Sequence, residues 1–182
     1  MVSKTIAIAG LPGAGSTTIA RILSRKLGIP YFSAGQMFKD VARENLHKQH
    51  YYLLFKKLCQ IHSLRIPQIK ISKNEDSALA VWKSDLGKNP IFHNILEHLQ
   101  QELVNQGNII IDGKLSIHML KKVSLRVWLS GSLKARASRV ASRESISIEK
   151  AISSLHQRQE LHRTEWKRIY NFDYLSQERE AD

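Results

Sequence analysis

Cysteine is almost absent from the sequence, which contains one, Cys59, and long apolar runs are absent altogether. A single cysteine cannot form an internal disulfide, so the chain is not a disulfide-stabilised secreted domain. No apolar run approaches the length that spans a bilayer, which excludes a transmembrane helix. Residues 1–4 lead into the first apolar run without the pattern of a signal peptide. We therefore expect a cytoplasmic protein with a reduced thiol and no membrane partner.

Acidic residues are also scarce, because 16 Asp and Glu stand against 28 Lys and Arg, a formal net charge of +12. This excess favours anionic partners, and nucleotides, nucleic acid and acidic membrane surfaces all carry the required charge. The remaining composition is ordinary, with 42% hydrophobic and 24% charged residues among 182. A chain of this length can bury one sizeable core, so we expect a single α/β domain, 1–182, that is a monomer.

A glycine-rich stretch between residues 10 and 18 has the clearest chemical meaning. It follows a short apolar run, 6–9, and precedes a helical pattern, which predicts a strand, a turn and a helix start. Small residues let backbone N–H groups approach an anion, and the helix N-terminus adds partial positive charge. The candidate phosphate-binding residues are Gly10, Leu11, Pro12, Gly13, Ala14, Gly15, Ser16, Thr17 and Thr18.

This stretch fits the P-loop pattern G-x-x-x-x-G-K-[ST] at all but one defined position. Gly10 and Gly15 occupy the glycine positions, and Thr17 supplies the hydroxyl that would face a metal ion. Ser16 stands where the pattern has lysine. The alternative is a glycine-rich turn without a ligand, but the strand and helix on either side favour a phosphate site.

Strands and helices alternate along the rest of the chain. Gly28 and Pro30 end the helix after the loop, and a short strand should follow, parallel to the first through a right-handed crossover. Such alternation is typical of a doubly wound parallel sheet with helices on its faces. The expected helices span 18–27, 36–44 and 91–106, and the further strands span 31–35, 108–114 and 125–129.

Polar residues follow two of these strands at the edge where parallel sheets bind ligands. Asp112 ends the strand 108–114 and should lie beside the phosphate loop, where a carboxylate can hold a metal-bound water or order the reacting groups. The alternative is that Asp112 only caps the next turn. Residues 33–39 fall at the same edge, after the strand 31–35.

Residues 45–88 have the least regular pattern. Apolar and aromatic residues at 51–61 suggest a helix, whereas Pro67 makes 65–71 extended. Basic side chains are scattered through the segment. The simplest interpretation is a solvated insertion with its aromatic residues on the core, and the alternative is a nucleic-acid surface. The histidines show no partners for a zinc site; they are His47, His50 and His62.

Two basic helices are expected after residue 132. Arg136, Arg139 and Arg143 are spaced by three and four, which places three guanidinium groups on one helix face. A second helix carries Arg158 and further basic residues. A solvated basic face is the common explanation of this spacing. Because a phosphate loop is also present, we expect the two helices to close over phosphates as an arginine clamp.

These motifs together resemble the nucleoside monophosphate kinases, most closely the archaeal type of cytidylate kinase. The loop of that family commonly has the sequence G-P-P-G-S-G-T-T-T, which itself lacks the lysine. The resemblance covers about residues 4–44 and 88–173. Further matches are Ser33 to Lys39 with S-A-G-x-I-F-R, Gly107 to Leu115 with G-N-V-V-L-E-G-R-L, Arg136 to Glu144 with R-A-x-R-I-A-x-R-E, and Tyr170 to Asp173 with Y-G-I-D.

The resemblance implies a role for each candidate. Residues 10–18 would bind the β- and γ-phosphates of ATP, with Thr17 toward Mg²⁺. Arg139 would lie over the adenine or ribose side of ATP, and Arg143 with Arg158 would neutralise the transferring phosphoryl group. The acceptor nucleotide would be held by Ser33, Gly35, Lys39 and Lys114, the two lysines on its monophosphate.

The chain departs from the family pattern at several positions. Lys39 and Lys114 replace arginines, which keeps the charge and loses the bidentate contact with phosphate. Residues 93–100 replace a helix with the pattern D-R-x-x-D-R-R-Q, which bears on the base, and Glu165 stands where an arginine is expected. The sequence ends at Asp182, where the family continues into an edge strand, so we expect four strands or a sheet that is completed by something else.

The resemblance implies a P-loop kinase-like fold with a core at 1–44 and 89–131, an acceptor-binding insertion at 45–88 and a basic helical lid at 132–170. The leading hypothesis is ATP-dependent phosphorylation of a nucleoside monophosphate, CMP or dCMP. One alternative is a non-catalytic or weakly ATP-hydrolysing P-loop protein that binds RNA through the basic segment 45–88. Another is a kinase for a different small acceptor.

Overall fold

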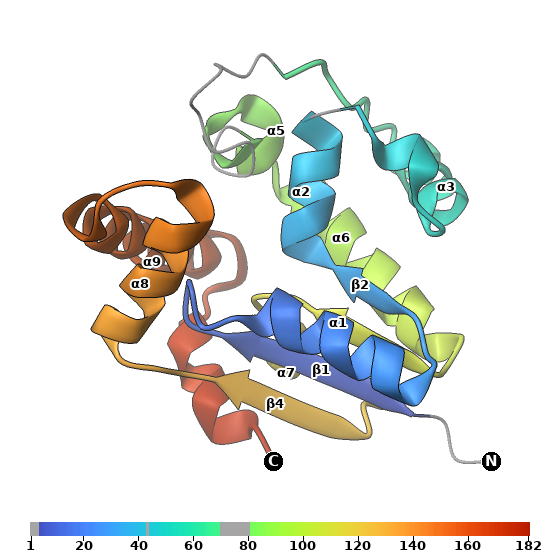
Figure 1. Ribbon diagram of the computed structural model, residues 1–182. Coiled ribbons are helices and arrows are strands. Elements are labelled where there is room, and N and C mark those ends of the chain that lie inside the picture. The colour runs from blue at the N-terminus through green and yellow to red at the C-terminus, as the bar shows by residue number, and fades with distance from the viewer. Residues whose placement is uncertain (1–3, 43, 70–80) are drawn as a thin grey trace.

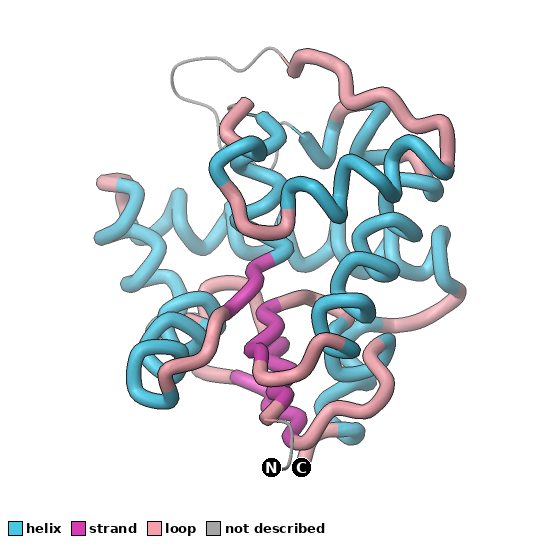
Figure 2. Tube along the Cα trace, turned by 90° about the vertical axis from the view of Figure 1, so that its right-hand side faces the viewer, coloured by secondary structure: helices cyan, strands magenta, loops and turns pink. Residues whose placement is uncertain are grey.

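The computed structural model describes residues 4–42, 44–69 and 81–182. At its centre is a four-stranded parallel sheet with the strand order β2-β3-β1-β4. Helices cover both faces of the sheet (Figure 2). The strands are β1 (Thr5–Gly10), β2 (Tyr31–Ser33), β3 (Ile109–Asp112) and β4 (Leu125–Leu129).

The side-chain alternation of β1 divides the core between the two faces of the sheet. Ile6 and Ile8 point to one face, where they pack with Ile110 and with Ala20 of α1 (Ser16–Leu27). Ala7 and Ala9 point to the other face, into the larger core. All six residues of β1 are buried, as a central strand with both faces covered requires.

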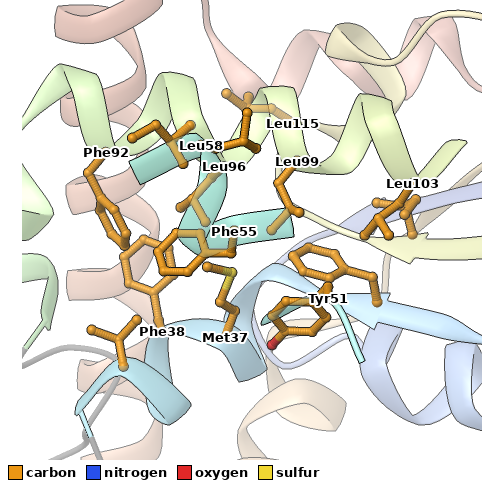
Figure 3. Close-up of a cluster of buried hydrophobic side chains, with 14 of the residues drawn as sticks. Met37, Phe38, Tyr51, Phe55, Leu58, Phe92, Leu96, Leu99, Leu103 and Leu115 are labelled. Atoms are coloured by element: carbon orange, nitrogen blue, oxygen red, sulfur yellow. The ribbon is translucent and has the colours of Figure 1, made fainter. Parts of the chain in front are cut away.

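The larger core lies between the sheet and the helices of its second face (Figure 3). Phe38, Phe55, Phe92 and Leu99 are each at most 4% exposed, so three separate helices share one apolar interior. The elements on this side, in chain order, are α2 (Ala34–Ala42), η1 (Leu46–Lys48), α3 (Tyr52–Ile61), α5 (Asp85–Lys88), α6 (Pro90–Asn105) and α7 (Ser116–Met119).

Two further helices, α8 (Leu133–Glu144) and α9 (Ile148–Tyr170), form a hairpin beyond the carboxyl end of the sheet (Figure 1). Small residues such as Ala137 and Ala151 let the two helices approach closely around their own apolar core. Each helix starts at a serine whose hydroxyl accepts a backbone N–H, Ser132 for α8 and Ser147 for α9. These hydrogen bonds define the first residue of each helix of the hairpin.

The last element, η2 (Tyr174–Glu180), returns to the sheet. Asp182 donates its backbone N–H to the Arg126 carbonyl of β4 at 3.0 Å, and its carboxylate accepts the Arg126 N–H at 2.8 Å. Among the described residues no helix has both the length and the apolar character needed to cross a bilayer.

The structure confirms the parallel α/β sheet of four strands that the sequence predicts. β2 is parallel to β1 as expected, but β3 lies between them. The helix expected from 36 begins at Ala34, directly after β2. In the segment expected to be extended, residues 65–69 form neither helix nor strand, and 70–71 lie outside the described residues. The division into core, insertion and lid stays a prediction.

Candidate active site

A cleft of about 840 Å³ opens at the carboxyl ends of the strands, where α8 and α9 face the sheet. The loop after β1 forms its floor, and side chains of α2, α6, α8 and α9 form its walls. Ligands of open parallel sheets bind at this edge, because the strands end there and the following helices begin. A nucleotide fits a cleft of this size, so the cleft is the candidate active site.

The loop between β1 and α1 is held tightly at its start. Leu11 donates its backbone N–H to the Leu129 carbonyl at the end of β4, at 3.0 Å. A Cβ at Gly10 would overlap that same carbonyl oxygen, so the approach of the two chains requires glycine. Gly13 has φ +78°, in the left-handed region. After this turn α1 begins at Ser16, and its first backbone N–H groups are available to an anion at the loop.

Asp112 connects β3 to the loop and to β2. Its Oδ2 accepts hydrogen bonds from the Thr17 hydroxyl at 2.6 Å and the Ser33 hydroxyl at 2.8 Å. The register that pairs Ile8 with Asp112 brings the carboxylate level with the loop. These contacts disfavour the alternative in which Asp112 only caps a turn. Oxygen atoms from three elements therefore meet beside the loop, and oxygen ligands are those that Mg²⁺ prefers.

Lys114 extends from the end of β3 back to the loop. Its Nζ donates to the Gly10 carbonyl at 2.5 Å, while its own carbonyl accepts the amide of the buried Gln177 at 2.7 Å. Burial lowers the pKa of Lys114 to about 8; the Asp112 carboxylate opposes this effect, and Arg158 adds to it. An ammonium group thus lies at the floor of the cleft, against the first residue of the loop.

Two arginines of α8 bind the carbonyls of the loop. Arg136 is buried and donates from Nη1 to the Pro12 carbonyl at 3.0 Å. Arg139 is exposed and donates to the carbonyls of Gly13 and Ala14, both at 3.3 Å. The expected face of three guanidinium groups is therefore divided, because Arg136 binds protein carbonyls and does not line the cleft, whereas Arg139 does.

Arg143 and Arg158 lie on the same side of the cleft and share one carboxylate. Arg143 Nη2 is 2.6 Å from Glu144 Oε1, and Arg158 Nη2 is 3.5 Å from the same oxygen. Both arginines line the cleft, although they come from different helices. Glu144 therefore holds together the two cations for which the family resemblance implies a role at the transferring phosphoryl group.

The opposite end of the cleft is aromatic. Trp82 stacks on Phe38 with ring centroids 5.3 Å apart, and it meets Trp166 edge to face at 4.8 Å. His93 is buried behind them and its Nε2 lies 2.7 Å from the Gly87 carbonyl. Burial lowers the pKa of His93 to about 4, so the imidazole is neutral at pH 7. This end of the cleft is lined by aromatic rings that pack against one another.

Uncharged polar groups lie among these rings. Burial raises the pKa of Glu97 to about 8, although the Gln100 amide donates to its carboxyl at 3.1 Å. Burial, with Lys114 and Arg158 nearby, lowers the pKa of His162 to about 3. Within the described part of the chain, Gln100 Oε1 and His162 Nδ1 are buried without a hydrogen-bond partner. Such atoms suit a planar ligand with a polar edge.

The structure brings most of the predicted site residues into this one cleft. Ala14 and Ser33 are not in its wall: the Ala14 N–H donates to the Leu11 carbonyl, and the Ser33 hydroxyl is taken by Asp112. The predicted residues that line the cleft are Gly10, Leu11, Pro12, Gly13, Gly15, Ser16, Thr17, Thr18, Gly35, Lys39, Asp112, Lys114, Arg139, Arg143 and Arg158.

Sequence reasoning missed the aromatic end of the cleft. Its residues come from the irregular segment 45–88, from α2, from α6 and from α9. Helical spacing relates the residues within α6 and within α9, but no spacing in the sequence joins the four elements. The altered helix pattern at 93–100 was the one signal that pointed to this end. The residues missed are Phe38, Trp82, Glu97, Gln100, His162 and Trp166.

The described part of segment 45–88 packs on the core through Tyr51 and Phe55, and the thiol of Cys59 is buried and free. No three His, Cys, Asp or Glu side chains among the described residues are grouped to hold a metal ion. Binding of RNA by this segment stays a prediction, as does the monomeric state.

Comparison with known proteins agrees with this geometry. The model of the cytidylate kinase-like family matches residues 5–182. The chain belongs to the cytidylate kinase-like family. The cytidylate kinase of Methanothrix thermoacetophila is 32% identical over 168 residues, which cover 92% of this chain and 80% of that protein. The cytidylate kinase of Pyrococcus horikoshii is 27% identical and is covered to 72% of its length, with 92% of this chain matched.

Solved structures share the fold of this cytidylate kinase-like chain. TT1252 from Thermus thermophilus has a TM-score of 0.54 at 18% identity, over 100% of this chain and 86% of that one. An uncharacterized protein from Eubacterium ventriosum has a TM-score of 0.55 at 14% identity, over 98% and 84%. At these identities the likeness shows the fold. Family membership supports nucleoside monophosphate kinase activity, which implies use of ATP.

Proposed function

We propose that this protein transfers the γ-phosphoryl group of ATP to a nucleoside monophosphate, CMP or dCMP, forming the nucleoside diphosphate and ADP. One observation carries the proposal: the loop of residues 10–18 and the arginines Arg139, Arg143 and Arg158 line the same cleft. Phosphoryl transfer depends mainly on positioning and on neutralising the charge of the equatorial oxygens, and this arrangement provides both.

The loop residues fit the donor phosphates. The left-handed turn at Gly13 and the start of α1 at Ser16 leave backbone N–H groups beside the cleft, where a phosphate can accept them. Arg136 and Arg139 hold the loop from its other side by binding its carbonyls. The loop is therefore shaped before ATP binds, which reduces the entropy lost on binding.

Thr17 and Asp112 fit a magnesium ion. Their side-chain oxygens lie 2.6 Å apart at the floor of the cleft, and Asp112 is a carboxylate that can hold a metal-bound water. Bound Mg²⁺ supplies positive charge on the phosphate oxygens. The protein orients the Thr17 hydroxyl through its hydrogen bond to the Asp112 carboxylate.

Arg143 and Arg158 fit the transferring group. Both are bound to Glu144, a negative group that a phosphoryl group can replace as their partner. The hairpin that carries them is held to the loop through Arg136, and Trp166 of α9 lies in the larger core, so the two side chains can change partners without a movement of the whole hairpin. The bound nucleotides would also exclude water, which would otherwise compete as an acceptor.

The acceptor fits the remaining part of the cleft. Lys39 and Lys114 supply positive charge for its monophosphate, and Gly35 at the start of α2 leaves room beside them. The stacked rings of Phe38 and Trp82 suit a planar base, with Glu97 and Gln100 at its polar edge. The cytidylate kinases to which this chain is similar make cytosine the base of choice.

An acceptor panel tests the proposal. ADP release is measured with ATP and Mg²⁺ in the presence of CMP, dCMP, UMP, AMP or GMP, and in the absence of any acceptor. We expect the highest kcat/KM with CMP or dCMP and little release without an acceptor. Equal ADP release with and without every monophosphate would refute the proposal and would favour a weak ATPase.

A further inference from the structure

Ser16 leaves the phosphate loop without the lysine that usually reaches the β- and γ-phosphates. Backbone N–H groups carry only partial charges, so a loop of this kind needs a full positive charge from elsewhere. Two arginines at the loop do not supply it directly: Arg136 is buried on the Pro12 carbonyl, and Arg139 donates to the carbonyls of Gly13 and Ala14.

Lys114 brings an ammonium group to the inner side of the loop. β3 and β1 are parallel neighbours in which Asp112 pairs with Ile8, so a residue two positions beyond Asp112 lies beside Gly10. The Lys114 Nζ accordingly lies 2.5 Å from the carbonyl oxygen of Gly10. The strand register, not the local sequence of the loop, places this charge at the first loop residue.

The backbone around Lys114 is fixed. The buried Gln177 donates from Nε2 to the Lys114 carbonyl at 2.7 Å, and the N–H of Gly113 donates to the Ile8 carbonyl at 3.1 Å. An ammonium group has three donors, and the Gly10 carbonyl takes one of them. Donors therefore remain for phosphate oxygens in the cleft that Lys114 lines.

We infer that Lys114 supplies, from the end of β3, the donor-phosphate contact of the lysine that the loop lacks at position 16. The inference rests on the proposed function, since it takes the loop as the ATP site. It extends the role of Lys114 beyond the acceptor monophosphate, because its ammonium group contacts the phosphate loop at Gly10 and also lines the cleft that Lys39 lines. Lys39, on α2, keeps its proposed role as a ligand of the acceptor monophosphate.

The test is the affinity for a nonhydrolysable ATP analogue with Mg²⁺ and no acceptor, measured by calorimetry on four proteins: the wild type, Lys114→Met, the double variant Ser16→Lys with Lys114→Met, and the control Lys39→Met. We expect Lys114→Met to weaken analogue binding about tenfold or more, as the loss of a charged hydrogen bond does. The double variant should recover to within about threefold of the wild type, because the lysine returns at position 16. Lys39→Met should leave the affinity within about twofold.

Two outcomes would overturn the inference: unchanged analogue affinity in Lys114→Met, with only the acceptor KM raised, or no recovery in the double variant. If Lys114→Met does not fold, Lys114→Gln and the charge-retaining Lys114→Arg give the same comparison, and equal affinities of these two would also overturn it. A wild-type protein that binds no analogue contradicts the proposed function itself, so the two failures are distinguishable.

Discussion

The Thr17 hydroxyl and the Asp112 carboxylate lie 2.6 Å apart, although 95 positions separate them in the chain. The contact exists because β1 and β3 are neighbours in a parallel sheet and both end at the cleft. It orients a side chain of the loop whose hydroxyl oxygen can bind a metal ion. The geometry of the phosphate site therefore depends on a residue outside the loop.

Replacing Asp112 with Asn tests this dependence, because the change keeps the shape and removes the charge. We expect kcat/KM at saturating Mg²⁺ to fall roughly 10- to 100-fold, as it does when a partner of a metal site is lost. Ser33→Ala removes the other hydrogen bond to Asp112 and serves as the control, with a smaller effect. Activities of both variants equal to that of the wild type would show that Asp112 has no part in the site.

Arg158 should act on the transition state and contribute little to ground-state binding. We expect Arg158→Ala to lower kcat about 10³-fold, because the charge on the transferring phosphoryl group is then not neutralised, while the affinity for ATP changes little. Arg163→Ala is a matched control on the same helix, since Arg163 forms an exposed ion pair with Asp173 at 3.1 Å. Steady-state kinetics would contradict this role if both variants lost the same activity.

Arg136 should matter for stability more than for chemistry. Its buried guanidinium holds the Pro12 and Gly131 carbonyls, both at 3.0 Å. Arg136→Met leaves these carbonyls without that donor, and we expect the free energy of unfolding to fall by about 2–3 kcal/mol. Arg139→Met removes an exposed arginine from the same helix and should lower it by less than about 1 kcal/mol. Denaturant unfolding of both variants measures the difference, and equal losses would refute the distinction.

Glu97 should make the stability depend on pH. Its pKa is raised to about 8 in the folded protein, from 4.5, so the folded state binds more protons than the unfolded state between these values. The free energy of unfolding therefore falls as pH rises from about 4.5 to about 8, by at most about 1.4 kcal/mol per pH unit. In Glu97→Gln this contribution is absent.

Two histidines of the cleft, His93 and His162, change the stability in the opposite direction at lower pH, so the effect of Glu97 is measured above the pH range in which they act. The pKa values of His93 and His162 are lowered to about 4 and about 3, from 6.5, so their contribution to stability rises with pH up to about 6.5. Between pH 6.5 and 8 the free energy of unfolding should fall more steeply with pH in the wild type than in Glu97→Gln. If the free energy of unfolding changed with pH equally in the two proteins over this range, Glu97 would be ionised in the folded protein.

Local patterns correctly predicted the turn between β1 and α1 and the strand at 125–129, because strand ends and helix starts are encoded in a few adjacent residues. The position of Asp112 beside the loop followed from the rule that parallel strands end at one edge. The burial of Arg136 could not be predicted, since its spacing is the same as that of the exposed Arg139 and only the packing of α8 against the loop distinguishes them.

The aromatic end of the cleft was beyond sequence reasoning for a related reason. Trp82 and Trp166 are 84 positions apart, and their ring contact at 4.8 Å depends on how α9 returns over α6. Neither residue belongs to a motif or to a periodic pattern that carries chemistry. The same holds for the strand order, in which β3 lies between β1 and β2.

The central claim is that the cleft transfers a phosphoryl group from ATP to a nucleoside monophosphate. The most direct measurement follows the label of [γ-³²P]ATP with Mg²⁺ and CMP, separating the products by thin-layer chromatography. Transfer predicts that the label appears in CDP at the rate at which ADP forms. Label that appears only as free phosphate, or that stays in ATP with CMP and with every other monophosphate, would contradict the account.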